Sequence, residues 1–442
     1  VAHILEHSVL CGSKKFPAKD PFVELVKGSL NTFLNAITYP DKTVYPIASC
    51  NDKDFDNLME VYLDAVFYPN VYTEPKIFMQ EGWHYELVDD KGSPDKNGEV
   101  ILNGVVYNEM KGAFSSADSV LERSITKTLF EGHSYGEESG GDPDIIPTLT
   151  YENFLDMHSK YYHPSNSYIY LYGDMDMANK LDRIDREYLS KFEYKFVDSK
   201  IEEVKPLEKM KERNFEYPIT ESQNEENATY LSWNTLVGGE LEPTVYMGFQ
   251  ILEYVLIDAP GAPLMQALID AGIGEDVYGG YANGISVPYF GVTAKNSNLD
   301  KKSEFLAVIE STLRKLADKG LDKEAIKAAI NVFEFRAREA DYGSYPKGLM
   351  YGLSSFDSWL YDADPTMHLR FENIFKTLRD EVEKGYFEDL IEKYLLDNKN
   401  TAIVTMTPKK GLTTKKDNEL KEKLAAFRAT LSKEELRKIY DD

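Results

Sequence analysis

Apolar residues recur with a helical period along much of the first 200 positions of this chain. Between Asn51 and Phe67 they return every three or four residues, behind an Asn/Asp start that can cap a helix. By the same reasoning we predict helices over residues 1–10, 20–30, 149–162 and 177–192, and a long helical stretch from 100–112 through Leu129. The first part of the chain is therefore expected to be rich in helices with one buried face.

Shorter β-prone segments lie between these helices. Residues 31–39 and 43–49 flank Pro40-Asp41, which predicts a hairpin or strand pair, and residues 168–172 are predicted to form a buried strand. Strands and helices therefore alternate, which indicates an α+β fold with mostly antiparallel sheets packed against helices.

A charge-rich segment, residues 196–213, interrupts this pattern and is the best candidate for a linker. Beyond it we predict strands near 228–233 and 279–293 and helices over 245–257, 263–271 and 302–319, an order that loosely repeats the first part. Residues from about 409 onward are rich in Lys, Glu and Leu at helical spacing. We therefore expect two tandem units, 1–205 and 206–408, and connecting helices over 409–442.

Composition and net charge limit the kinds of molecule that this chain is expected to bind. Its 442 residues are 42% hydrophobic, which supports several folded domains. The formal charge of −25, from 50 Lys+Arg and 75 Asp+Glu, argues against nucleic acid as a partner and favours cationic peptides. An acidic surface that serves only solubility accounts for the same charge.

The sequence contains no signal for a membrane or a disulfide framework. No segment approaches the roughly 20 apolar residues that span a bilayer, and the start resembles neither a signal nor a transit peptide. Cys11 and Cys50 lack the C-x-x-C spacing of thiolate zinc sites. We expect a reducing compartment, which would be the bacterial cytoplasm or, alternatively, an organellar matrix.

The first helix carries the residues with the clearest chemistry. His3 and His7 are four positions apart in an H-x-x-E-H pattern, so they share one helix face and could bind one zinc ion. Glu6 lies at the edge of that face, where it could act as general base toward water at the metal. Two histidines beside a carboxylate are also typical of a solvated helix face.

A catalytic zinc ion needs a third protein ligand. Glu109 is the best candidate, because it is a single carboxylate in the otherwise apolar start of a predicted helix, VVYNEMKG. The alternative is a structural glutamate that favours the positive end of the helix dipole.

The remaining histidines show no paired metal spacing, and we interpret them as packed or hydrogen-bonded residues. Cys11 follows His7 by four positions, but a thiolate ligand would close a site that catalysis needs open. We interpret it as structural, with oxidation sensitivity as an alternative.

Beyond the motif, the sequence contains several longer blocks that can be compared with known families. They are HILEHSVLCGS, DPFVELVKGSLNTFLNAITYPDKTVYPIAS, EGWHYELV, GVVYNEMKG and GGDPDIIPTLTYENFLDMHSKYYHPSN. These blocks resemble the presequence protease branch of the pitrilysin/insulinase family of inverzincin metallopeptidases. Their order and spacing also agree, over nearly the whole chain.

The resemblance implies a zinc endopeptidase that degrades unstructured peptides inside a chamber. It implies His3, His7 and Glu109 as zinc ligands and Glu6 as the base. It also implies that substrate pairs as an added strand with the edge that includes Asn35, Ala36 and Thr38, beside an apolar pocket shaped by Leu10 and Phe22. From the residues alone, these five positions would be ordinary strand and core.

Members of this branch are about twice as long, and their second half contributes an Arg and a Tyr near the scissile bond. The resemblance therefore implies a missing C-terminal half and, because His3 lies so close to Val1, missing strands before the zinc helix. We expect little activity from the isolated chain. A non-catalytic scaffold of the same fold and an enzyme half that works with a separate partner subunit are the alternatives, and the second unit, which lacks H-x-x-E-H, is expected to be a non-catalytic wall.

Overall fold

The structure is a computed structural model that describes residues 1–19 and 21–441, and it divides into two compact units. Unit 1 combines Val1–Ser116, Glu138–Lys200 and the described residues from Leu412 onward, whereas unit 2 combines Ala117–Glu137 and Ile201–Gly411. The two tandem sequence units expected above, 1–205 and 206–408, remain a prediction, because the spatial units follow the packing of the chain and not its sequence order. Each spatial unit is built from segments that are distant along the chain.

Unit 1 is mainly helical, as its periodicity predicts. Its helices are α1 (Ala2–Val9), α2 (Pro21–Gly28), α3 (Asp52–Phe67), α4 (Pro75–Glu81), α5 (Val105–Ala113), α7 (Tyr151–Tyr161), α8 (Met177–Glu187), α16 (Leu412–Thr430) and α17 (Lys433–Asp441). Its strands are β1 (Asn31–Leu34), β2 (Ile37–Thr38), β3 (Thr43–Val44), β4 (Ile47–Ser49), β5 (His84–Val88) and β6 (Glu99–Asn103).

Two helices of unit 1 begin at the caps that the sequence indicates. The Asn51 side chain accepts a hydrogen bond from the Asp54 amide at 3.0 Å and starts α3. Thr150 and Asn153 form a reciprocal capping box at the start of α7. Both predicted helices are confirmed, because these side chains satisfy amides that have no partner inside the helix.

The metal-motif helix α1 is fixed by its apolar face. Ile4 and Leu5 are 1% and 0% exposed and belong to a core cluster that includes Phe78 of α4, Val106 of α5 and Phe154 of α7. Burial of each such side chain contributes about 1.5–3 kcal/mol. The short helix α1 is therefore held in place by three other helices.

The predicted hairpin over residues 31–49 is confirmed as a bent pair of antiparallel ladders. β1 pairs with β4, and β2 pairs with β3 in the register Ile37↔Val44 and Thr38↔Thr43. Among the described residues no further strand pairs with β2. One edge of β2 therefore carries no ladder hydrogen bonds from within the described chain.

The predicted strand at residues 168–172 is wrong. This segment forms no strand and joins no ladder in the described part of the chain, and Tyr168 and Tyr172 are 40% and 48% exposed. A β-prone run becomes a strand only where a second strand pairs with its backbone groups. Local sequence carries no information about that partner.

The long helical stretch predicted to run through Leu129 is also wrong. β6 precedes α5, which ends at Ala113, and α6 (Ala117–Leu129) is a separate helix that belongs to unit 2. The Ser115 hydroxyl donates to the Gly112 carbonyl at 2.6 Å and so satisfies one of the free carbonyls at the helix end. Gly112 lies one residue before the end of α5, but a single Gly is tolerated inside a helical pattern, so periodicity alone misses the break.

Unit 2 is organised around a five-stranded sheet with the order β7-β11-β8-β10-β9. The strands are β7 (Lys211–Ile219), β8 (Thr229–Leu236), β9 (Asp276–Ala282), β10 (Tyr289–Ser297) and β11 (Thr401–Lys410). β11 runs parallel to β7, and the other neighbours are antiparallel. The expected α+β class with mostly antiparallel sheets is confirmed.

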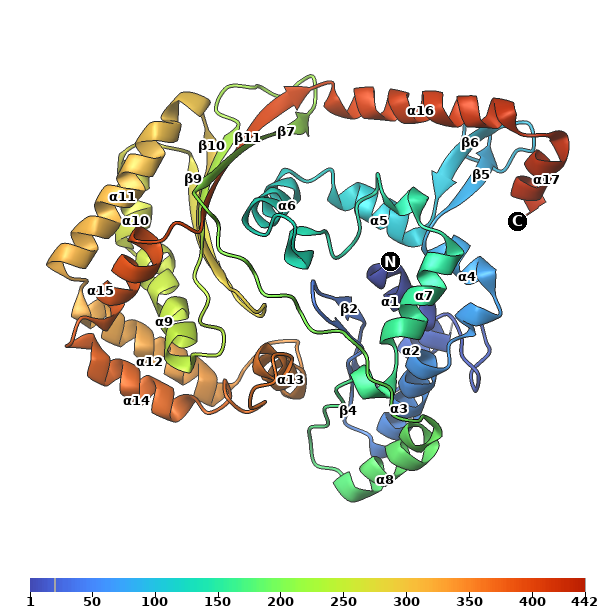
Figure 1. The fold of residues 1–442 in the computed structure, drawn as a ribbon, viewed down its shortest axis with the longest axis horizontal. Coiled ribbons are helices and arrows are strands. Elements are labelled where there is room, and N and C mark those ends of the chain that lie inside the picture. Colours follow the sequence, from blue (N-terminus) through green and yellow to red (C-terminus); the bar gives the residue numbers. More distant parts are fainter. Residues whose placement is uncertain (20, 442) are drawn as a thin grey trace. The chain divides into compact units, whose positions relative to one another are not determined.

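Both faces of this sheet are covered, so every residue of the central strand β8 is buried. α6 packs on one face, and most of the other helices pack on the opposite face (Figure 1). Besides α6, the helices of unit 2 are α9 (Pro243–Glu253), α10 (Pro263–Asp270), α11 (Lys302–Lys319), α12 (Lys323–Glu339), α13 (Lys347–Trp359), α14 (Phe371–Val382) and α15 (Tyr386–Leu390). Residues 245–257 divide into α9 and a π-helical turn, Tyr254–Asp258.

The C-terminal helix pair packs within unit 1 against the β5–β6 hairpin. The Phe427 ring stacks on Tyr85 with a centroid distance of 4.5 Å. The Arg428 guanidinium donates to the carbonyls of Asn97 and Gly98 at 2.9 and 2.8 Å. No helix among the described residues is long and apolar enough to cross a membrane.

A buried histidine makes the stability of unit 1 depend on pH. His158 is 3% exposed, and its ring bonds to the Tyr72 hydroxyl and the Val66 carbonyl. Burial lowers the pKa of His158 to about 4. The unfolded chain, with a pKa of about 6.5, binds a proton that the folded chain lacks, so stability falls as the pH drops from about 6.5 to 4.

We expect this histidine to remove about 3 kcal/mol from the free energy of unfolding over that range. Urea denaturation of the wild type and of His158→Asn at several pH values measures the effect. The wild type should lose more stability than the variant on acidification. Equal losses in both proteins would contradict the prediction.

Candidate metal centre and general base

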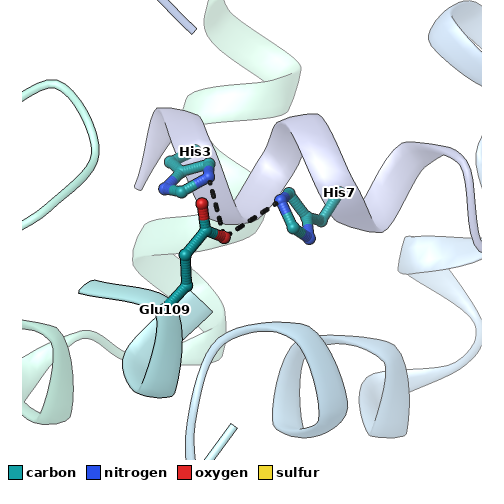
Figure 2. Close-up of side chains that lie close together, drawn as sticks. All are labelled: His3, His7 and Glu109. Atoms are coloured by element: carbon teal, nitrogen blue, oxygen red, sulfur yellow. Dashed lines mark ion pairs between the residues drawn. The ribbon is translucent and has the colours of Figure 1, made fainter. Parts of the chain in front are cut away.

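Two histidines and one glutamate of unit 1 direct their side chains toward a common point. The Nε2 atoms of His3 and His7 lie 3.6 and 3.8 Å from Glu109 Oε2 (Figure 2). One ligand atom from each residue lies within 4.8 Å of the others, and among the described residues this is the only such cluster. Ligands about 2.0–2.2 Å from a tetrahedral zinc ion are themselves about 3.3–3.6 Å apart, so the cluster is slightly wider than a zinc-bound set, and small side-chain movements would bring its three atoms to zinc-binding distance.

The elements that carry these ligands come from distant parts of the sequence. His3 and His7 lie on α1, where their rings make an edge-to-face contact with a centroid distance of 4.9 Å. Glu109 lies on α5, and its side chain is 53% exposed. The cluster therefore has a buried side, formed by α1, and a side open to solvent.

The other ring nitrogen of each histidine has a partner of its own. His3 Nδ1 lies 2.8 Å from the Gly140 carbonyl, and His7 Nδ1 lies 3.3 Å from Glu81 Oε2. A donor proton on each Nδ1 leaves Nε2 as the lone-pair atom that faces Glu109. Such outer partners usually orient metal-binding histidines.

Glu81 also changes the electrostatics of this helix. Burial disfavours the charged ring of His7, but the hydrogen bond to Glu81 and the charges of Glu6, Glu81 and Glu109 raise its pKa overall. Burial likewise opposes ionisation of Glu81, yet hydrogen bonds from His7 and Gln80 lower its pKa overall. Glu81 is 6% exposed, so solvent screens little of the attraction between its carboxylate and the His7 ring.

Glu6 lies on α1 between the two histidines in sequence and is 6% exposed. The Thr38 hydroxyl of β2 donates to Glu6 Oε2 at 2.5 Å. Sequence reasoning assigned Thr38 to substrate binding only, and it did not predict this bond. A carboxylate next to a candidate metal cluster, with one oxygen held by a hydroxyl, can accept a proton at its other oxygen.

The expected substrate-binding residues divide between the hairpin and the core. Asn35 and Ala36 lie between β1 and β2, with Asn35 exposed. Leu10 is 8% exposed at the end of α1 and, with the half-buried Phe22, joins a cluster that also contains Ala36. These residues lie on the elements next to α1, and their part in substrate binding stays a prediction.

The remaining histidines and Cys11 make contacts outside the cluster. His84 bonds to the Met79 carbonyl, and His133 and His163 accept hydrogen bonds from nearby amides. The Cys11 thiol contacts Glu81 Oε1 and the His7 carbonyl at 3.5 and 3.6 Å. The packed and hydrogen-bonded roles predicted for these histidines are confirmed.

Sequence reasoning missed Glu81 and the Gly140 carbonyl. Glu81 lies in the block EGWHYELV, where a carboxylate among aromatic and apolar residues was a usable signal. No side-chain signal exists for Gly140, because it contributes a main-chain oxygen.

Two family profiles match separate parts of the chain. The profile described as insulinase (peptidase family M16) matches residues 1–77, and the profile described as peptidase M16 inactive domain matches residues 148–333. The first match contains His3, Glu6 and His7.

Curated relatives match over the whole chain. Protein HypA of Clostridium perfringens is 52% identical over 100% of this chain and 45% of its own length. Presequence protease 1, chloroplastic/mitochondrial, of Arabidopsis thaliana is 40% identical over 99% of this chain and 41% of its own length. The chain therefore spans less than half the length of these two relatives.

Solved structures share the fold at low sequence identity. A protease from Helicobacter pylori matches with a TM-score of 0.70 and 15% identity, over 92% of this chain and 88% of its own. The first half of the periplasmic protease PqqL from Escherichia coli matches with a TM-score of 0.61 and 15% identity, over 100% of this chain and 86% of its own.

Proposed function

Because this chain belongs to the pitrilysin/insulinase (M16) family, as an N-terminal half related to presequence proteases, we propose that it carries the zinc site and general base of an endopeptidase. The observation that supports this most is the cluster of His3, His7 and Glu109 beside the buried Glu6. Two imidazoles, one carboxylate and a solvent-exposed side are typical of catalytic rather than structural zinc sites.

In the proposed mechanism His3, His7 and Glu109 would hold the metal, while the Gly140 carbonyl and the Glu81 carboxylate orient the two rings. A bound zinc ion would supply Lewis acidity, which polarises a carbonyl and lowers the pKa of water. Glu6 accepts a proton from the attacking water. It returns this proton to the nitrogen of the leaving amine as the peptide C–N bond breaks.

We propose unstructured peptides as substrates. The edge of β2 that pairs with no described strand can accept a peptide as an added strand, and main-chain hydrogen bonds would bind it with little regard to sequence. Leu10 and Phe22 would then offer an apolar contact beside the scissile bond. The net charge of −25 favours basic peptides over acidic ones.

We propose that activity requires a C-terminal half, which would close a chamber around the peptide. The support is that the chain covers 45% of the HypA relative and 41% of the presequence protease. We use the term two-half protein for this chain joined to its C-terminal half. For its location we propose a reducing compartment, the bacterial cytoplasm or an organellar matrix, which fits two cysteines, Cys11 and Cys50, that form no disulfide with each other.

A non-catalytic scaffold is the second candidate. It is favoured by the match of residues 148–333 to the profile of an inactive domain. That match shares no residue with the segment that contains the H-x-x-E-H motif, and most of it lies in unit 2, so it is compatible with a catalytic first unit and a non-catalytic second one.

Metal analysis and peptide cleavage distinguish these candidates. We expect close to one zinc per chain by elemental analysis. We also expect cleavage of an unstructured peptide by the two-half protein to stop with a chelator and to return with zinc. A zinc-free chain whose two-half protein does not cleave peptides would favour the scaffold.

Glu81→Gln should weaken zinc binding without removing a ligand. The amide cannot stabilise the His7 ring as the carboxylate does, and loss of such an outer partner typically costs 10–100-fold in metal affinity. Competition with a chromophoric chelator measures the change. Glu24→Gln, the same substitution at an exposed position on α2, should bind zinc as the wild type does. Equal affinity of Glu81→Gln and wild type would contradict the prediction.

A further inference from the structure

We propose that Thr38 is a positioning residue that aligns the carboxylate of Glu6 through its hydroxyl, in addition to any contact it makes with substrate. Its hydroxyl lies 2.5 Å from Glu6 Oε2, and among the described residues no other side chain hydrogen-bonds Glu6. This inference rests on the proposed function, in which Glu6 moves the proton.

The backbone around Thr38 is fixed by the hairpin. Thr38 pairs with Thr43, and the Tyr39 amide donates to the Lys42 carbonyl at 2.8 Å to close the turn. At the tip Lys42 forms an ion pair with Asp41 at 3.2 Å, and both side chains are almost completely buried. The turn therefore holds the Thr38 backbone at a fixed place beside α1.

The side chain of Thr38 adds little freedom of its own. A β-branched residue has few accessible χ1 rotamers, so a fixed backbone also places the hydroxyl. Its acceptor, Glu6, is on α1, whose apolar face is anchored in the core by Ile4 and Leu5. The hydrogen bond thus joins two rigid elements, which is the arrangement that preorganises a catalytic group.

A hydrogen bond to one carboxylate oxygen determines what the other oxygen can do. With Oε2 held by Thr38, the rotation of the Glu6 carboxylate is restricted, and Oε1 remains to accept and return the proton. Nearby, the Tyr45 and Tyr162 hydroxyls bond to each other at 2.8 Å. Burial raises the pKa of Tyr162 to about 12, so this pair stays neutral beside Glu6.

Thr38 also lies on the strand whose edge is proposed to receive the peptide. The same residue therefore connects the place where substrate pairs with the group that moves the proton. Loss of its hydroxyl should leave the main-chain edge intact and disturb the alignment of Glu6. The expected effect is on kcat rather than on KM.

The test compares Thr38→Val and Thr38→Ser in the two-half protein. Valine keeps the branched shape without the hydroxyl, whereas serine keeps the hydroxyl. We expect Thr38→Val to lower kcat by about 10–100-fold, because small misplacements of a catalytic group have effects of this size. KM should stay within about twofold, zinc content should be unchanged, and serine should restore most of kcat. Thr32→Val, at an exposed position on β1, should keep the kcat of the wild type.

A Thr38→Val protein with the kcat of the wild type would overturn the proposal, as would a loss confined to KM. If wild type cleaves peptides and Glu6→Gln does not, such results refute only the role of Thr38. If the wild type shows no zinc-dependent cleavage, the proposed function fails, and the role of Thr38 falls with it.

Discussion

Glu6→Gln should reduce kcat of the two-half protein by about 10²–10⁴-fold, the usual contribution of a positioned general base. Glutamine has nearly the same shape and can still accept the hydrogen bond from Thr38, but its amide cannot take up a proton at neutral pH. KM should change little, because the substitution leaves the proposed substrate edge of β2 untouched. The measurement is steady-state cleavage of a fluorogenic unstructured peptide.

The zinc content of the Glu6→Gln variant shows whether a loss of activity comes from the missing general base or from a missing metal ion. Glu6 is not a member of the ligand cluster, so the variant should bind as much zinc as the wild type. Glu24→Gln makes the same chemical change at an exposed position on α2 and should keep full activity. Undiminished cleavage by Glu6→Gln would contradict the prediction, because it would show that cleavage does not depend on the proposed base.

Glu109→Gln should weaken zinc binding more than Glu81→Gln does, by more than about 100-fold, because it removes the anionic ligand itself. Stability provides a measurement that does not depend on activity. Zinc that binds only the folded chain raises the free energy of unfolding by about 4 kcal/mol at a free concentration near 1,000 times Kd. Thermal unfolding with and without zinc should therefore show stabilisation of the wild type and little stabilisation of the variant.

Metal-free unfolding supplies the control for this experiment. Glu109 is 53% exposed, so without zinc its replacement should change stability by less than about 0.5 kcal/mol. His84→Gln removes a histidine of unit 1 that lies outside the cluster, and this variant should respond to zinc as the wild type does. Equal stabilisation of Glu109→Gln and wild type would mean that zinc binds elsewhere.

The local sequence predicted the helices of unit 1 well where it contained a capping residue or apolar residues at helical spacing. α3 and α7 begin after Asn51 and Thr150, whose side chains satisfy the first free amides. The hairpin around Pro40-Asp41 was predicted for a similar reason, since its two strands are neighbours along the chain. In each case the deciding interaction lies within about 20 residues.

Predictions failed where the deciding partner was distant. The segment at 168–172 has strand propensity but no described partner strand, and β11 was not predicted although it lies between β7 and β8. The break between α5 and α6 separates two spatial units, a division that helical periodicity does not record. Packing against remote segments overrides propensity in such places.

The sequence by itself determined which side chains of this protein can carry metal and proton chemistry. Four-residue spacing puts His3 and His7 on one face of α1, because a helix turns once in about 3.6 residues. Only the tertiary structure decided that Glu109 lies 3.6 and 3.8 Å from them, that Glu81 and Gly140 hold the rings, and that Thr38 holds Glu6. These contacts join residues 32 to 137 positions apart, and they form because α1, α4, α5 and the hairpin bury their apolar faces together.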